Sequence, residues 1–315
     1  MNAIELNNIT KTYTTKKNVV TAVDDISFSV DEGELFGLIG PDGAGKTSIF
    51  RILTTVLLAD KGIATVLGLD VVKDYEIIRK SVGYMPGRFS LYQDLSVEEN
   101  LNFFATIFNK SIEENYELIS DIYKQLEPFK TRRAGKLSGG MKQKLALSCA
   151  LIHKPKVLFL DEPTTGVDPV SRKEFWEMLK RLKALGISIL VSTPYMDEAN
   201  LCDRIALMQS GKILEIDTPQ NLRNRFDKNL YAVKSKNMFQ LLNDLRVYSK
   251  TESCFAFGGY HHLVLNEVKP DMNELKSYLK NHSELEITLI KPGIEDRFMQ
   301  LMKKAHPNPS LREGL

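Results

Sequence analysis

The sequence lacks any apolar run that approaches the ~18–20 residues needed to cross a lipid bilayer. It is also poor in cysteine, and its three cysteines, Cys149, Cys202 and Cys254, are too widely spaced to favour a disulfide framework or a zinc site. The first residues show neither the basic segment nor the apolar core of a secretory signal. These absences predict a cytoplasmic protein whose cysteines are free thiols.

Charge of one sign is not in excess either. The chain carries 42 Lys and Arg against 40 Asp and Glu, a net charge of +2, so it lacks the basic surplus that is typical of nucleic-acid-binding proteins. A chain of 315 residues is long enough for one large domain and one smaller domain. We therefore expect two domains and no nucleic-acid partner.

One glycine-rich stretch matches the pattern G-x-x-x-x-G-K-[ST] of a phosphate-binding loop. It consists of Gly40, Pro41, Asp42, Gly43, Ala44, Gly45, Lys46 and Thr47. The apolar run before it predicts a buried strand, and the helical spacing of Ile49, Ile52, Leu53, Val56 and Leu57 predicts a helix that begins close to Lys46. Free N–H groups and the helix dipole then point the same way and form an anion site.

The motif predicts a role for each of its last two side chains, Lys46 and Thr47. Lys46 would reach the β- and γ-phosphates of a nucleotide, and the Thr47 hydroxyl would ligate Mg²⁺. The alternative is a glycine-rich turn with a chance lysine, and the strand and helix on either side of the stretch disfavour it.

Two further stretches carry groups that suit phosphate chemistry. Asp161 ends an apolar run, where its carboxylate suits a Mg²⁺ site, and Glu162 follows it in a position to polarise a water molecule. Ser138, with Gly139 and Gly140 after it, precedes a helical pattern and forms a second helix start that can bind an anion. On the residues alone, a pair of capping acids and an ordinary helix cap remain open as alternatives.

The distribution of apolar residues indicates an α/β fold. Apolar runs at 157–160 and 187–191, with helical spacing at 171–185 between them, predict buried strands that alternate with helices in a mostly parallel sheet. Alternating apolar residues at 26–30 predict a half-buried antiparallel strand, and residues 97–150 have helical character.

Two shorter signals and the end of the chain complete the predicted order. Residues 82–85 predict a short strand, and the Gly-containing turn at 209–212 predicts a hairpin. We place a first domain at residues 1–225, with a helical subdomain at about 88–150, a second domain at 226–305 and a flexible tail at 306–315. The predicted strands of the second domain are 231–234, 254–257, 262–268 and 285–290, its helices are 238–245 and 272–279, and a last helix runs over 294–304. The order β-α-β-β-α-β is that of a ferredoxin-like arrangement.

Taken in order, these motifs resemble the nucleotide-binding subunit of an ABC transporter over about residues 4 to 225. Gly40–Thr47 corresponds to Walker A, Leu137–Gln143 to the signature motif, Val157–Glu162 to Walker B and Thr164–Asp168 to the D-loop. The resemblance implies a P-loop NTPase cassette with a mostly parallel sheet core, an antiparallel β subdomain and a helical subdomain, followed here by a small α+β domain.

The resemblance also implies what each motif binds. Each ATP would lie between the Walker motifs of one chain and the signature of a second chain in a head-to-tail dimer, with Tyr13 stacked on the adenine. Glu162 and Lys46 would be catalytic, and Thr47 and Asp161 would hold Mg²⁺. The implied ATP-binding residues are Tyr13, Gly40, Pro41, Asp42, Gly43, Ala44, Gly45, Lys46, Thr47, Ser48, Ser138, Gly139, Gly140, Gln143 and Asp168.

The implied partner is a separate transmembrane permease, which would hold the chain on the inner face of the cell membrane. Residues 290–298 are similar to the appended domain of drug- and antibiotic-exporting subunits, so export of an unidentified substrate is the preferred direction. A soluble ABC protein that acts on ribosomes or DNA is disfavoured, because the chain has a single cassette and shows no long coiled coil. Whether the dimer joins like or unlike chains is left open.

Two positions depart from the family pattern. Gly87 stands where the family has a glutamine, with Gln93 as a nearby candidate substitute, and Pro194 stands where the family has a histidine. One lost transition-state contact typically costs ~10²–10³ in rate. Because the Walker residues are intact, we predict an ATPase; the alternative is a slow or silent ATP-binding half of a heterodimer that lends Ser138–Gln143 to a competent partner.

Overall fold

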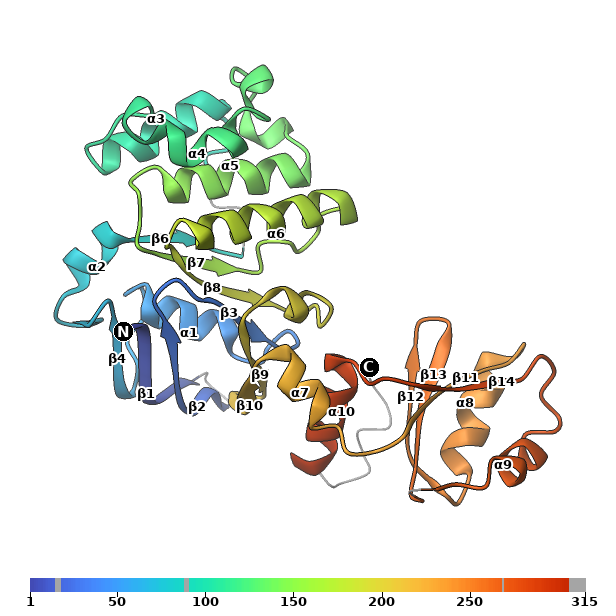
Figure 1. Ribbon diagram of the computed structural model, residues 1–315. Helices are drawn as coiled ribbons and strands as arrows, with labels where there is room; N and C mark the ends of the chain where they lie inside the picture. Colours follow the sequence, from blue (N-terminus) through green and yellow to red (C-terminus); the bar gives the residue numbers. More distant parts are fainter. Residues whose placement is uncertain (15–17, 88–90, 268, 306–315) are drawn as a thin grey trace. The chain divides into compact units, whose positions relative to one another are not determined.

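The computed structural model describes residues 1–14, 18–87, 91–267 and 269–305, and the chain forms two compact units, Met1–Gln220 and Asn221–Leu315 (Figure 1). Each unit has a hydrophobic core of its own. Across these described ranges, no helix is both long and apolar enough to cross a membrane.

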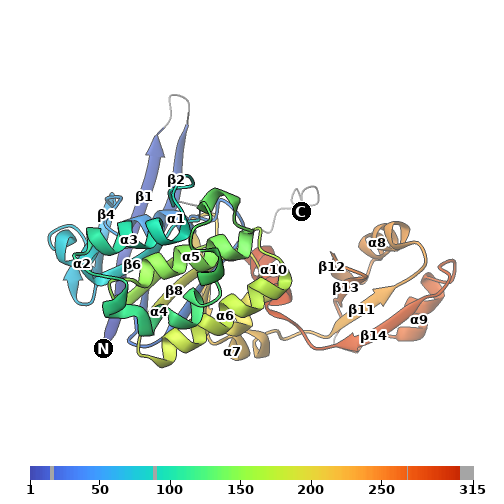
Figure 2. The ribbon, with the colours of Figure 1, turned by 90° about the horizontal axis from the view of Figure 1, so that it is seen from above.

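The first sheet of the larger unit is antiparallel and has the strand order β2-β1-β4-β5. Its strands are β1 (Asn2–Thr14), β2 (Val19–Asp31), β4 (Lys61–Val66) and β5 (Leu69–Asp70). Figure 2 shows β1 and β2 side by side along their length. Ile26, Phe28 and Val30 alternate with more exposed residues and are buried, as period-two spacing predicts for a strand with one covered face.

The second sheet has the strand order β10-β9-β3-β8-β7-β6 and forms the centre of the unit. Its strands are β3 (Leu35–Ile39), β6 (Val82–Met85), β7 (Val157–Asp161), β8 (Ser188–Thr193), β9 (Arg204–Gln209) and β10 (Lys212–Asp217). All neighbours run parallel except β9 and β10, which form the predicted hairpin. Its turn residues Ser210 and Gly211 both have positive φ, as a two-residue hairpin turn of type I′ requires.

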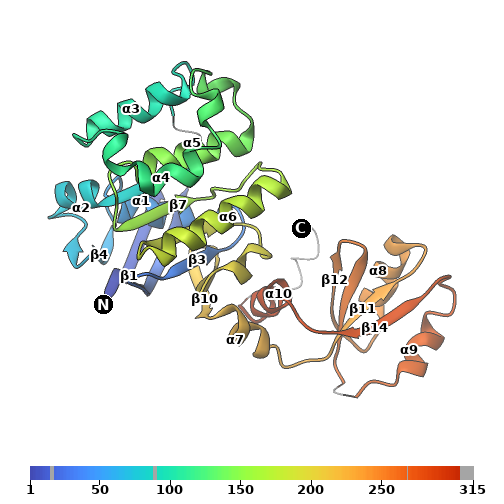
Figure 3. The same ribbon diagram turned by 45° about the horizontal axis from the view of Figure 1, so that its top comes forward.

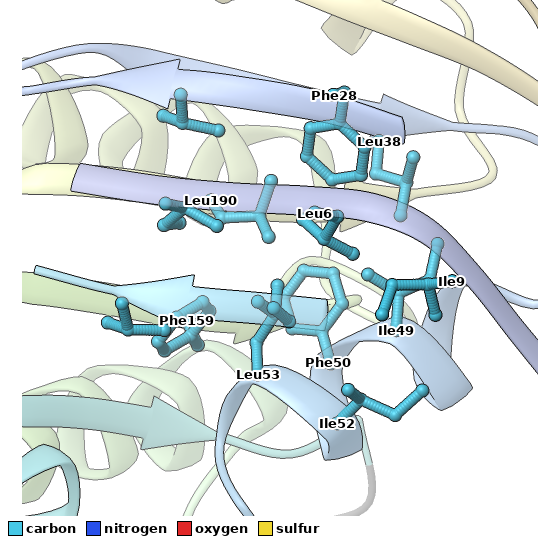
Figure 4. Packing of buried hydrophobic residues seen from close by; sticks show 14 of the residues in the cluster. Leu6, Ile9, Phe28, Leu38, Ile49, Phe50, Ile52, Leu53, Phe159 and Leu190 are labelled. Carbon is cyan, nitrogen blue, oxygen red and sulfur yellow. The ribbon is translucent and has the colours of Figure 1, made fainter. Parts of the chain in front are cut away.

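Helix α1 (Lys46–Leu53) packs between the two sheets. Its residues Ile49, Phe50 and Leu53 lie in one cluster with Leu6 of β1 (Figure 4). The Phe50 and Phe159 rings meet edge to face, with their centroids 6.2 Å apart. This packing anchors the helix start that the phosphate loop needs.

The predicted helical stripe is wrong beyond Leu53. The chain turns at Thr55, where φ is 63°, and Val56 is 64% exposed. Arg79 of helix α2 (Tyr75–Ser81) holds this turn, because its Nε donates to Thr55 Oγ1 at 2.7 Å and its Nη2 donates to the Thr55 carbonyl at 2.9 Å.

The remaining helices of this unit follow the sequence pattern closely. They are α3 (Val97–Ile107), α4 (Tyr116–Tyr123), α5 (Gly139–Leu151) and α6 (Pro169–Ala184), with 3₁₀ turns η1 (Glu113–Asn115), η2 (Glu127–Phe129), η3 (Ala134–Lys136) and η4 (Glu198–Leu201). Helix α5 contacts both α3 and α4, and the three form the helical part of the unit (Figure 3). Helix α6 begins at Pro169 rather than at residue 171, because Asp168 caps its first turn.

The smaller unit is built on an antiparallel sheet with the order β12-β13-β11-β14. After α7 (Pro219–Asn224), its elements are β11 (Leu230–Lys234), α8 (Met238–Val247), β12 (Thr251–Phe257), β13 (Tyr260–Leu265), α9 (Met272–Tyr278), β14 (Glu286–Ile290) and α10 (Ile294–Ala305). The element order through β14 is the predicted β-α-β-β-α-β. The predicted strand end at Val268 and the tail 306–315 lie outside the described residues.

Candidate nucleotide-binding site

The predicted phosphate-binding residues lie at the carboxyl ends of β3, β7 and β8. In the parallel register, Ile39 pairs with Thr193 and Asp161 pairs with Ser192, so three strands end side by side. Ligands of parallel α/β sheets bind outside this edge, where helix starts and strand ends meet.

The loop Gly40–Thr47 is attached to the sheet through its first residue. The Gly40 N–H donates to the Thr193 carbonyl at 3.2 Å, and a Cβ at Gly40 would collide with the Met208 carbonyl. Gly45 precedes α1 at φ 106°, a conformation that favours glycine, and it has no side chain to cover the first N–H groups of the helix. The loop therefore presents backbone donors in the geometry of an anion site.

Lys46 is the buried cation of the site. It is 3% exposed, and its Nζ donates to the Gly40 carbonyl at 2.6 Å and to the Pro41 carbonyl at 3.0 Å. The same Nζ lies 3.3 Å from Glu162 Oε1. The structure thus brings both predicted catalytic side chains together beside the loop, with Thr47 half-buried next to Lys46.

Asp161 and Glu162 are fixed by a serine at the end of the neighbouring strand. Ser192 Oγ donates to Asp161 Oδ1 at 2.6 Å, and the Glu162 N–H donates to Ser192 Oγ at 2.9 Å. Glu162 has φ 51°, an uncommon conformation for a residue with a side chain, and it turns the chain sharply at the end of β7. Asp161 is buried and Glu162 is partly exposed, which suits a metal ligand and a water-facing base.

The position of the missing glutamine borders the same carboxylate. A Cβ on Gly87 would lie 3.1 Å from the Asp161 carbonyl oxygen and 3.6 Å from Asp161 Oδ2. The backbone carbonyl of Gln93, the nearby candidate substitute, accepts from the Gly135 N–H at 2.9 Å. Burial, with a further contribution from the charge of Asp161, raises the pKa of Tyr84 to about 12, so the hydroxyl of Tyr84 stays protonated.

Tyr13, the predicted adenine-stacking residue, is joined to the start of α1. Its hydroxyl lies 3.1 Å from Ser48 Oγ, and the residue is 37% exposed. The ring therefore stands at the rim of the loop with area left for a partner.

The predicted signature residues lie at a second helix start. Ser138 caps α5 by accepting from the Met141 N–H at 3.4 Å, and a Cβ on Gly140 would meet Ser171 Oγ at 2.5 Å. Asp168 caps α6 in the same way, and hydrogen bonds from Ser171 and Val170 hold the pKa of its carboxyl below the usual range. The signature and the D-loop thus adjoin each other at the starts of α5 and α6, and Gln143 is half-buried one turn into α5.

Sequence reasoning missed the residues that connect these segments. Ser192 holds both Walker B acids, and Glu198 accepts hydrogen bonds from Thr164 and Thr193. Ser192 and Thr193 stood in the sequence only as neighbours of the unusual Pro194. The contacts of Ser192 with the two acids and that of Thr164 with Glu198 join residues 30 to 34 positions apart. Thr193 and Glu198 are five positions apart, in a stretch that matches no recognised motif.

In this site a glycine loop joins the buried parallel strand β3 to helix α1, and Lys46 lies beside Glu162 at the end of β7. This arrangement defines a P-loop nucleotide-binding cassette. Comparison with known proteins narrows this class. A family profile described as ABC transporter matches residues 23–165. The chain belongs to the ABC transporter ATP-binding proteins.

Two relatives and one solved structure illustrate the match. Nod factor export ATP-binding protein I of Rhizobium sp. (strain N33) is 34% identical over 308 residues, which cover 95% of this chain and 96% of that protein. The probable multidrug ABC transporter ATP-binding protein YbhF of Escherichia coli (strain K12) is 37% identical over 294 residues, which cover 92% of this chain but 50% of the relative. This chain therefore spans half the length of that relative. A solved ATP-binding subunit of an ABC transporter has a TM-score of 0.64 and 27% identity, and the match covers 71% of this chain and 93% of that one.

Proposed function

We propose that this chain binds ATP with Mg²⁺ and hydrolyses it to ADP and phosphate, and that the cycle powers export through a separate membrane protein. The observation that carries the proposal is the cluster at the ends of β3, β7 and β8: Lys46 Nζ lies 3.3 Å from Glu162 Oε1, and Asp161 precedes Glu162. Membership of the ABC family supports the same chemistry.

The residues take distinct parts in this chemistry. The backbone N–H groups of Gly40–Thr47 bind the phosphate chain, and Lys46 exchanges its carbonyl partners for the β- and γ-phosphate oxygens. The Glu162 carboxylate orients the attacking water and accepts its proton. Tyr13 offers its partly exposed ring to the adenine. The barrier falls mainly because charged groups are positioned before the reaction begins.

Thr47 and Asp161 are the residues that would hold Mg²⁺. They supply a hydroxyl and a carboxylate, and Mg²⁺ in nucleotide sites takes such oxygen ligands together with substrate phosphates. Consistent with a shared site of this kind, the described part of the chain has no group of three or more His, Cys, Asp or Glu that could cage a metal alone. The metal supplies charge to the phosphate oxygens when it is bound.

A second ATP-binding subunit would complete each site by bringing its own Ser138–Gln143 to the triphosphate. Ser138 caps α5 and the two glycines after it leave backbone N–H groups at the helix start, which suits the remaining face of an anion. Through a transmembrane permease the pair would sit at the inner face of the cell membrane. The name of the Nod factor export relative supports this direction of transport.

Gly87 and Pro194 favour a second candidate, a slow or silent ATP-binding half of a heterodimer. A glycine adjoins Asp161 where the family has a glutamine, and Pro194 has neither a side-chain donor nor an N–H. In this reading the chain holds ATP and lends its signature to a competent partner.

Single-turnover hydrolysis by the purified chain, compared with Glu162→Gln, separates the two. We expect the wild type to cleave ATP at least ~10²-fold faster than the variant. Equal rates, with ATP still bound, would contradict hydrolysis by this chain and favour the silent ATP-binding half of a heterodimer. Affinity purification of the chain from membranes would then identify the permease.

A further inference from the structure

Glu198, at the first position of η4, is a buried carboxylate that the proposed chemistry does not use. It is 2% exposed, yet its side chain lies within the segment that follows β8 and not at the phosphate loop. A buried charge is costly unless it is hydrogen-bonded and paired. Its partners therefore show what it does for the fold around it.

Each carboxylate oxygen of Glu198 accepts a hydrogen bond from a different segment. Thr164 Oγ1 donates to Oε1 at 2.7 Å, and Thr193 Oγ1 donates to Oε2 at 2.5 Å. Both threonines are fully buried. Glu198 thus joins the turn after β7 to the last residue of β8.

The two threonines are the neighbours of the catalytic segments. The Thr165 N–H donates to the Glu162 carbonyl at 3.2 Å, and the Val167 N–H donates to the Thr164 carbonyl at 3.2 Å, so Thr164 is part of the turn that begins at Glu162. On the other side, the Thr193 carbonyl accepts the Gly40 N–H, which attaches the phosphate loop. One carboxylate therefore spans the Glu162 turn and the loop attachment.

Among the residues that the structure describes, one cation, Arg172, adjoins this carboxylate. Arg172 Nε lies 3.5 Å from Glu198 Oε1, and the Arg172 guanidinium stacks over the Tyr195 ring at 4.2 Å. Arg172 also approaches Asp197 Oδ2 at 3.7 Å, but the Asp197 side chain is 74% exposed. The chain thus offers two adjacent acids that share one arginine, of which only Glu198 also binds the threonines.

We propose that Glu198 is a positioning residue that holds the Glu162 turn against the end of β8, so that Glu162 keeps its place beside Lys46. The proposal rests on the proposed ATPase function for its effect on rate. Glu162 has φ 51°, and such a conformation persists only where surrounding contacts hold it. With Pro194 in place of a histidine, Glu198 ties this strand end to the turn through Thr193 and Thr164, beside the hydrogen bonds that Ser192 makes to Asp161 and Glu162.

The test changes either the Thr164 donor or the charge of Glu198, one at a time. Thr164→Val deletes the donor, Thr164→Ser restores a hydroxyl, and Glu198→Gln removes the charge. Asp197→Asn is the matched control, because it removes the neighbouring acid and leaves both threonine bonds. For each variant we would measure kcat and KM for ATP, the Kd of a non-hydrolysable ATP analogue, and amide hydrogen exchange at Thr165 and Val167.

For Thr164→Val and Glu198→Gln we expect kcat to fall about tenfold and the Kd to change by less than about twofold. Amide exchange at Thr165 and Val167 should become about tenfold faster. Thr164→Ser and Asp197→Asn should behave as the wild type. Unchanged exchange in both test variants, or equal effects of Asp197→Asn, would overturn the proposal. Amide exchange needs no ATP turnover, so it tests the role of Glu198 separately from the proposed ATPase. If the wild type hydrolysed ATP no faster than Glu162→Gln, the ATPase would be contradicted, and the exchange result would still decide the role of Glu198.

Discussion

Lys46 Nζ lies 3.3 Å from Glu162 Oε1 while it also donates to two carbonyls of its own loop. The cation that is proposed to hold the γ-phosphate is therefore paired with the base proposed to act on the water. A phosphate bound there would compete with this carboxylate for the same ammonium group, so the two residues proposed to be catalytic are coupled through their shared position.

Replacing Glu162 by glutamine should therefore tighten nucleotide binding while it slows hydrolysis. The pair is partly exposed on the glutamate side, and pairs of this kind contribute about 0.5–1 kcal/mol, so we expect a Kd for ATP about two- to fivefold lower. Equilibrium titration with a fluorescent ATP analogue measures it. Glu177→Gln, which removes an exposed acid of α6 paired with Lys180, is the control and should leave the Kd unchanged.

Restoring a histidine at position 194 should raise the rate of hydrolysis. A histidine provides a side-chain donor for the γ-phosphate that Pro194 lacks, and one such contact is typically worth ~10²–10³ in rate. We expect Pro194→His to gain about tenfold or more in single-turnover rate at an unchanged Kd. Pro194→Ala also frees the backbone but adds no donor; if it gained as much as Pro194→His, the histidine contact would not be the cause.

The stability of the larger unit should depend on pH through His153. Burial lowers the pKa of this histidine, its Nε2 lies 3.0 Å from the Val82 carbonyl, and its ring stacks on Phe108 at 3.8 Å. The unfolded chain binds the proton more readily, so this contribution is complete above about pH 6.5 and is lost as the pH falls below it. Denaturant unfolding from about pH 7.5 to about pH 5.5 should show a steeper fall for the wild type than for His153→Gln. Parallel curves would exclude His153 as the source.

The three cysteines should react slowly in the native protein. All are buried free thiols, and burial raises the pKa of Cys149 and Cys202 strongly and that of Cys254 to about 12. Because the thiolate is the reactive form, a disulfide reagent near neutral pH should modify all three in denaturant but none rapidly in the folded chain. Rapid modification of one cysteine in the native state would place that cysteine in a segment that opens readily. Cys→Ser substitution at each position in turn identifies the cysteine that reacts.

Local features were predictable from the sequence. The strand, loop and helix around Gly40–Thr47 are adjacent in the chain, so spacing alone placed them, and the cap at Ser138 needed only its neighbours. The end of α1 was not predictable in this way, because Arg79 fixes the Thr55 turn from another helix. Leu57 continues the helical spacing in sequence although the helix has ended.

The arrangement of the candidate site was predictable only in part. Lys46, Asp161 and Glu162 were assigned from their motifs, yet nothing local placed Ser192 on both acids or Glu198 between Thr164 and Thr193. Such contacts depend on which strands become neighbours and in which register. That information is distributed over the whole sheet and absent from any single stretch.

The end of β8 has a consequence for how this enzyme class can vary. Ser192 and Thr193 make the connections there, through the Walker B acids on one side and the Gly40 N–H on the other, and both precede Pro194. The scaffold is thus secured one residue before the position that is proposed to affect the rate. Under the proposed function, exchange of the residue at 194 would change the speed of ATP turnover with little effect on the framework around the phosphate loop.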